Sequence, residues 1–95
     1  MDLAPPDIAW FREQSDIILV PIGSCEQHGA HLPLATDTLI ATETAKRVAQ
    51  LMPEALLGPT LPIGVSTHHL AFPGTLSISE TCFQDQVADL SLIHI

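Results

Sequence analysis

The feature that most constrains the fold is an uninterrupted apolar run at residues 17–22, IILVPI. A run rich in β-branched side chains is typical of a strand that is buried on both faces, as in a parallel sheet. Parallel strands need a crossover connection, which is usually a helix. Residues 37–52 fit this role, because small and apolar side chains recur along one helical face at Ala41, Ala45, Val48 and Met52. Pro53 ends that helix, and residues 55–61 are the candidate for the next parallel strand. The pattern therefore predicts an α/β fold.

Two further helices and one long loop complete the predicted organisation. Residues 8–14 read as a short helix with Trp10 and Phe11 as its apolar patch, and residues 80–88 read as a second helix. Between them, residues 64–79 form a loop that contains the sequence FPGT at 72–75. Pro-Gly at the centre of a tetrapeptide predicts a type II turn, because glycine accepts the positive φ of the third position. Loops of this length are usually functional.

Composition narrows the class of protein. The chain has 95 residues, which corresponds to at most one small domain or a piece of one. Its three Lys and Arg against eleven Asp and Glu give a net charge of -8, which disfavours nucleic acid and anionic membranes as partners. The N-terminus lacks the pattern of a signal peptide, and no apolar run approaches the roughly 18 residues of a membrane span. Two cysteines are too few for a disulfide scaffold. We therefore expect a cytoplasmic protein with reduced thiols.

Candidate metal ligands cluster in the two loops that follow the two predicted strands. Glu26 and His28 lie two residues apart in the first loop, and Asp37 begins the following helix; His31 and the pair His68 and His69 complete the cluster. Ligands of open α/β sheets bind at the carboxyl ends of the strands, so these side chains are expected to converge on one rim. Carboxylate oxygen and imidazole nitrogen are ligands of zinc, manganese and similar divalent ions.

Simpler interpretations exist for each of these residues. Asp37, with Thr36, is well placed to cap its helix, and a loop histidine more often makes ordinary hydrogen bonds. The turn at 72–75 is also explained by its conformation alone. Cys25 near His28 resembles a nucleophile beside its base, but no further triad partner is evident, so we treat Cys25 as a packing residue.

Two long motifs decide between these interpretations. The string PIGSCEQHGAHLPLATD at residues 21–37 closely resembles the signature of the creatininase (creatinine amidohydrolase) family. The string GVSTHH at 64–69, which runs into FPGTLS at 72–77, is similar to the second motif of that family and comes in the expected order. The resemblance extends from Trp10 to Asp89, and two motifs at compatible spacing make a specific signal.

This resemblance implies a three-layer αβα fold with a mainly parallel sheet, of which residues 1–89 are the N-terminal part. It also implies a site with two divalent ions, zinc or manganese, in the intact protein: Glu26 and His28 each bind one ion and Asp37 bridges both. The implied reaction is hydrolysis of a non-peptide carbon-nitrogen bond in a small amide, cyclic amide or formamide. Such ions lower the pKa of water and polarise an amide carbonyl. His31 and His68 are assigned to outer partners of the ligands or to substrate contacts.

Several expectations depend on how much of the family pattern the chain contains. Family members are much longer, and a later His-Gly-Gly-Asn-like or His-x-Glu segment supplies their remaining ligands. We therefore expect this chain to bind metal weakly and to be inactive alone, and the intact protein to form a homo-oligomer. Residues 90–95 coincide with a translated transposon-end sequencing adapter, so we expect them to be read-through, with no function for His94. The rival function is a non-catalytic α/β interaction module whose loop histidines are structural.

Overall fold

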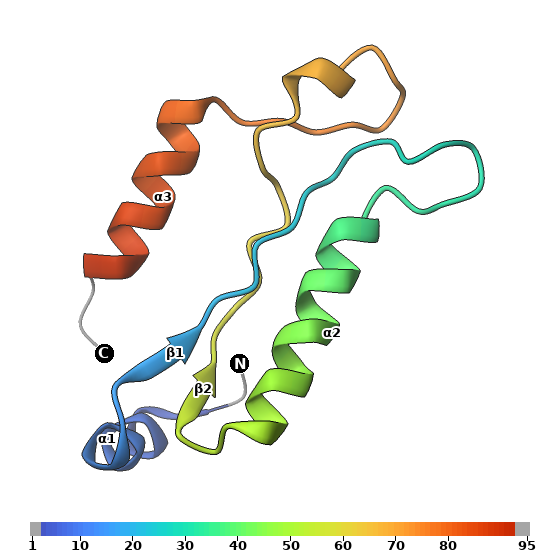
Figure 1. The fold of residues 1–95 in the computed structure, drawn as a ribbon. Helices are drawn as coiled ribbons and strands as arrows, with labels where there is room; N and C mark the ends of the chain where they lie inside the picture. The colour runs from blue at the N-terminus through green and yellow to red at the C-terminus, as the bar shows by residue number, and fades with distance from the viewer. Residues whose placement is uncertain (1–2, 93–95) are drawn as a thin grey trace.

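The computed structural model describes residues 3–92, so the expectations for His94 and its neighbours at 93–95 lie outside the described residues. In chain order the elements are helix α1 (Pro5–Gln14), strand β1 (Ile17–Leu19), helix α2 (Thr36–Leu51), strand β2 (Ala55–Leu57), the 3-10 helix η1 (Thr67–His69) and helix α3 (Glu80–Leu92). Figure 1 shows α2 and α3 on opposite sides of the two strands.

The central unit is a parallel pair of strands joined by a helix, as the sequence predicted. Ile17, Ile18 and Leu19 of β1 pair with Ala55, Leu56 and Leu57 of β2. The pairing resumes further on at a parallel bridge between Ile22 and Leu61. There the Gly23 amide donates to the Leu61 carbonyl at 2.8 Å, and the Leu61 amide donates to the Pro21 carbonyl at 2.9 Å. The two chains therefore run side by side as far as the loop that holds the candidate ligands.

The first strand is shorter and more exposed than expected. Regular pairing stops at Leu19, before Pro21, which has no amide hydrogen to donate to a ladder. The prediction of burial on both faces is wrong at the two ends of the run, where Ile17 is 41% and Ile22 is 45% exposed. Within residues 3–92 the sheet has two strands, so each strand has one open edge, and Ile22 lines an open groove on the face toward α3.

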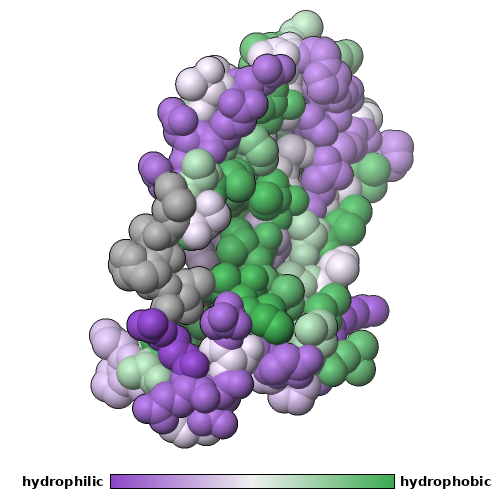
Figure 2. Space-filling model, turned by 60° about the vertical axis from the view of Figure 1, so that its left-hand side comes forward, coloured by the Kyte–Doolittle hydropathy of each residue, from purple (hydrophilic) through white to green (hydrophobic). Residues whose placement is uncertain are grey.

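Different helices lie on the two faces of the sheet. On one face, Leu19 and Val20 line an open pocket of about 340 Å³ together with Ala41, Ala45 and Val48 of α2. On the other, an open groove of about 230 Å³ separates the strands from α3, and its lining comprises Ile18, Val20, Ile22, Leu61, Val87, Leu90 and Ser91. Figure 2 shows an apolar strip across the middle of this side of the molecule. This helix, sheet, helix order is the layered arrangement that the sequence predicted.

Helix boundaries agree with the sequence analysis at α2 and differ at the other two helices. Helix α2 ends at Leu51, just before Pro53, as expected. Helix α1 starts at Pro5, and the Asp7 carboxylate accepts a hydrogen bond from the Ala4 amide at 2.9 Å. Helix α3 continues beyond the predicted end at residue 88 to Leu92. The buried apolar core among the described residues is small and consists of Ala55, Leu56 and Leu61.

Candidate metal centre

Backbone hydrogen bonds bring the loop after β1 back onto the start of α2. The Glu26 amide donates to the Leu34 carbonyl at 3.1 Å, and Gly29 takes a positive φ of 86° that turns the chain. The second loop lies alongside the first, because the Leu76 amide donates to the Cys25 carbonyl at 2.8 Å. In Figure 1 both loops lie at the same end of the molecule, beyond the carboxyl ends of the strands. This is the position at which α/β sheets bind ligands.

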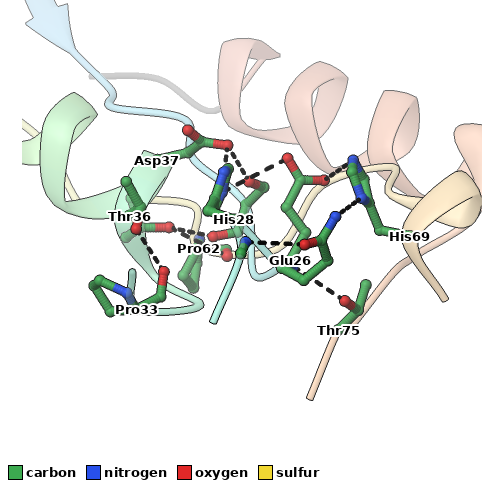
Figure 3. Close-up of polar contacts among 12 residues, drawn as sticks. Glu26, His28, Pro33, Thr36, Asp37, Pro62, His69 and Thr75 are labelled. Carbon is green, nitrogen blue, oxygen red and sulfur yellow. Dashed lines mark hydrogen bonds and ion pairs between the residues drawn. The ribbon is translucent and has the colours of Figure 1, made fainter. Parts of the chain in front are cut away.

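The structure brings Glu26, His28 and Asp37 together. The Nε2 atom of His28 lies 3.3 Å from Asp37 Oδ2 and 3.9 Å from Glu26 Oε1. One ligand atom from each of the three residues lies within 4.8 Å of the other two. Figure 3 shows His28 and Asp37 on one side of the Glu26 carboxylate and His69 on the other. The convergence expected from the sequence is thus present for these three side chains.

The His28 ring carries an unsatisfied nitrogen. Nε2 is the one buried side-chain nitrogen or oxygen atom without a hydrogen-bond partner in the part of the chain that the structure describes. Burying such an atom costs about 1–3 kcal/mol unless a partner satisfies it. A divalent ion beside Nε2 would supply that partner and would also offset the repulsion between the Glu26 and Asp37 carboxylates. The donor set of one imidazole and two carboxylates suits zinc or manganese, so the residues fit such an ion.

Asp37 is held by residues of the first loop and does not cap its helix. The residue before α2 is Ala35, and no side chain caps the helix N-terminus. Instead, the Ser24 hydroxyl donates to Asp37 Oδ2 at 2.7 Å. This hydrogen bond and the nearby His28 ring hold the pKa of Asp37 below its ordinary value. Asp37 is therefore kept as a carboxylate, the form that binds a cation, and its side chain is 43% exposed to an incoming ligand.

The histidine pair at the start of the second loop lies next to the same carboxylate. Nε2 of His69 lies 3.7 Å from Glu26 Oε2, and the His68 and His69 rings are 4.1 Å apart between centroids. Together with Glu26, the two histidines form a second group whose potential ligand atoms lie within 4.8 Å of one another. The sequence analysis assigned a role to His68 and none to His69. The adjacent pair was the available signal, but only the structure shows that His69 Nε2 lies 3.7 Å from Glu26 Oε2.

Two other residues from the sequence analysis lie outside these groups. His31 is exposed, and neither potential ligand group found among the described residues includes it. The Cys25 thiol is half-buried and lies 3.6 Å from the Gly74 carbonyl, which it contacts as a weak donor. Gly74 has a φ of 87° and Thr75 donates its amide to the Phe72 carbonyl at 3.3 Å, so the predicted type II turn is present.

Comparison with known proteins identifies the family. The profile of the creatininase family, described as creatinine amidohydrolase, matches residues 1–92. The chain belongs to the creatininase family. It is 49% identical over 69 residues to the mycofactocin precursor peptide peptidase of Mycobacterium ulcerans, covering 64% of this chain and 28% of the relative. It is 33% identical over 79 residues to the creatinine amidohydrolase of Pseudomonas putida, covering 78% of this chain and 30% of that protein.

A solved creatininase structure confirms the fold. A manganese creatininase superposes with a TM-score of 0.85 at 29% sequence identity, covering 94% of this chain and 37% of that protein. The predicted creatininase-like α/β fold with a parallel sheet is therefore confirmed. The chain spans about 30% of the length of the curated relatives named above. No helix among residues 3–92 has the length and apolar character needed to cross a membrane.

Proposed function

We propose that residues 1–89 form the N-terminal part of a metal-dependent hydrolase of amide carbon-nitrogen bonds, with Glu26, His28 and Asp37 as metal ligands. The observation that carries this proposal is the half-buried cluster of these three side chains around a His28 Nε2 atom that has no partner within residues 3–92. The family match supports it independently. In the rival function, a non-catalytic interaction module, His28 would be only a structural partner of Asp37, 3.3 Å away.

The proposed ligand roles follow the family motif. Glu26 and His28 each bind one of two ions, and Asp37 bridges them. Solved relatives described as a manganese creatininase and as a mutant creatininase of Zn–Zn type support zinc or manganese and a pair of ions. When bound, such ions lower the pKa of water and polarise an amide carbonyl.

The residues of this chain prepare the site for cations. The 2.7 Å hydrogen bond from Ser24 lowers the pKa of Asp37 and so favours its carboxylate form, and His28 must be neutral for its Nε2 lone pair to bind an ion. His68 lies within reach of Glu26, and we propose it as an outer partner or a substrate contact. For His31 the same role rests on its place in the first motif.

The substrate is proposed to be a small molecule with an amide bond. A relative described as a creatinine amidohydrolase supports a small non-peptide amide, and a solved mutant creatininase complexed with creatine supports a small-molecule ligand. A second candidate is a peptide bond of a short precursor peptide, because mycofactocin precursor peptide peptidases from three mycobacterial species are 42–49% identical to this chain. We further propose that the intact enzyme is a homo-oligomer.

Residues 1–95 alone are proposed to bind metal weakly and to lack activity. Three donors, with Asp37 shared, leave two ions short of the roughly four donors that each prefers. Sequence outside this segment would supply the others. Within the chain, residues 90–95 are proposed to be adapter read-through without a role in the site.

The test uses the full-length enzyme that carries this segment, purified with its metal. Glu26→Gln and Asp37→Asn should each lower the metal content measured by elemental analysis, and Glu54→Gln and Asp16→Asn, at exposed positions, should leave it unchanged. Unchanged metal content in the first pair would favour the interaction module. Turnover assays with creatinine and with a mycofactocin precursor peptide then separate the two substrate candidates.

A further inference from the structure

The Gln27 side chain has a fixed orientation between two partners. Its Oε1 atom accepts a hydrogen bond from the Gly29 amide at 3.0 Å, and its Nε2 atom lies 3.0 Å from Nδ1 of His69. A backbone amide can only donate, so the atom facing Gly29 must be the oxygen. The NH₂ group of Gln27 therefore faces His69, and this assignment follows from the hydrogen-bond network.

This orientation determines which nitrogen of His69 carries the proton. The Gln27 NH₂ group can only donate, so Nδ1 of His69 must accept. In the neutral ring the proton then lies on the other nitrogen, Nε2. That nitrogen faces Glu26 Oε2 at 3.7 Å, an ion-pair distance somewhat longer than a hydrogen bond.

The two oxygens of Glu26 consequently have different surroundings. Oε2 faces the N–H of His69, whereas Oε1 faces the His28 and Asp37 side, 3.9 Å from His28 Nε2. The Glu26 side chain is only 14% exposed, so water offers little competition for either oxygen. A donor on Oε2 alone would orient the carboxylate and leave Oε1 for a cation.

We propose that His69 is a positioning residue for Glu26, and that Gln27 sets its tautomer by donating to Nδ1. This inference rests on the proposed function, since it assigns the outer partner of one proposed metal ligand. It also explains the second group of potential ligands, which consists of Glu26, His68 and His69. His69 has Nδ1 engaged by Gln27 and Nε2 protonated, so it offers no free lone pair, and this group is not a separate metal site.

The first experiment measures the tautomer in the metal-free, full-length enzyme that carries this segment. Histidine is labelled with ¹⁵N, the long-range ¹H–¹⁵N couplings of the imidazole rings are recorded, and His69 is assigned from the signals lost in His69→Gln. We expect the proton on Nε2. Gln27→Glu replaces the donor by an acceptor and should protonate Nδ1, whereas Gln50→Glu, on an exposed part of α2, should change nothing at His69. A wild-type Nδ1–H tautomer, or an unprotonated Nδ1 in Gln27→Glu, would overturn the proposal.

The second experiment measures metal affinity. His69→Leu should weaken binding about 10–100-fold, the usual effect of removing an outer partner of a ligand. His69→Gln, whose side-chain NH₂ can donate to the same carboxylate oxygen, should retain more affinity than His69→Leu. Equal losses in both variants would contradict a donor role. The tautomer is read without metal, so its result stands apart from the Glu26→Gln test, whose failure would overturn the metal centre itself.

Discussion

Substitution of Gly23 by alanine tests how the first loop is aligned with helix α2. Gly23 follows the parallel bridge at Ile22 and lies directly against the first turn of α2. A Cβ atom at this position would lie 2.4 Å from Thr38 Cα, 2.4 Å from Thr38 Oγ1 and 2.7 Å from Thr38 N. Two of these three atoms belong to the backbone, so rotation of a side chain cannot relieve the overlap.

The size of the required movement follows from these distances. Ordinary Cβ contacts begin at 3.4 Å, so the helix and the strand must separate by about 1 Å, and overpacking of this kind costs about 1–3 kcal/mol of stability. Asp37 precedes Thr38 and moves with it, away from Glu26 and His28. Metal sites tolerate about 0.2 Å in ligand distances, and a misplacement of 1 Å can cost about 100-fold in activity.

The assay compares unfolding in urea and metal content in the full-length enzyme. Gly23→Ala should lose both stability and bound metal. The matched control is Gly58→Ala, whose Cβ would lie 3.0 Å from Ile18 Cδ1 and from the Leu19 carbonyl oxygen, away from the ligand loops. It should lose stability and keep its metal. If Gly23→Ala kept wild-type stability and metal content, the close contact between the loop and α2 would not exist in the protein.

Two further substitutions test individual contacts of the loops. Ser24→Ala should raise the pKa of Asp37 toward its ordinary value of 3.8, as followed by carboxyl NMR titration of the metal-free enzyme. Because the pKa of Asp37 is lowered in the folded state, its ionised form stabilises the fold fully above the ordinary pKa of 3.8, and this stabilisation is lost as pH falls through the folded pKa. An unchanged titration in Ser24→Ala would contradict the hydrogen bond. Gly74→Ala should destabilise by about 1–2 kcal/mol in urea unfolding, because its φ is 87°. Gly29→Ala, at a φ of 86° and with the added Cβ in ordinary contact with the His31 ring at 3.5 Å, should cost a similar amount. A much larger loss for Gly74→Ala would show that Leu34, whose Cδ1 lies 2.4 Å from the added Cβ, cannot move aside.

The parallel unit could be predicted from the sequence because its signals are local. An apolar run, a helix with one apolar face and Pro53 indicate where a strand and a helix begin and end, and α2 ends within one residue of the prediction. The extent of β1 was overestimated, because apolar composition reports burial and does not show that Pro21 interrupts the ladder. The N-terminal cap was also wrong, because Asp37 makes its hydrogen bond to Ser24, 13 residues away.

Which candidate site residues lie together could be predicted from the sequence only where the contacts are local. Glu26, His28 and Asp37 lie within one motif, and the structure brings them together. His69 could not be distinguished from His68, because the contact of its Nδ1 atom is with Gln27, 42 residues away in the sequence. Whether the three side chains bind metal stays a prediction.

Hydrogen bonds between the loops, more than apolar packing, determine the geometry of this site. The buried apolar core within residues 3–92 consists of three small or medium side chains, Ala55, Leu56 and Leu61. These are too few to fix two loops to within tenths of an ångström. Polar contacts provide that precision instead: Thr38 Oγ1 donates to the Ser24 carbonyl at 2.9 Å, and the Gln27 amide donates to Thr75 Oγ1 at 3.2 Å. The first contact ties the ligand loop to α2 and the second ties it to the loop that carries His69. Since each bond contributes only about 0.5–1.5 kcal/mol, losing one should shift the ligands while the fold persists.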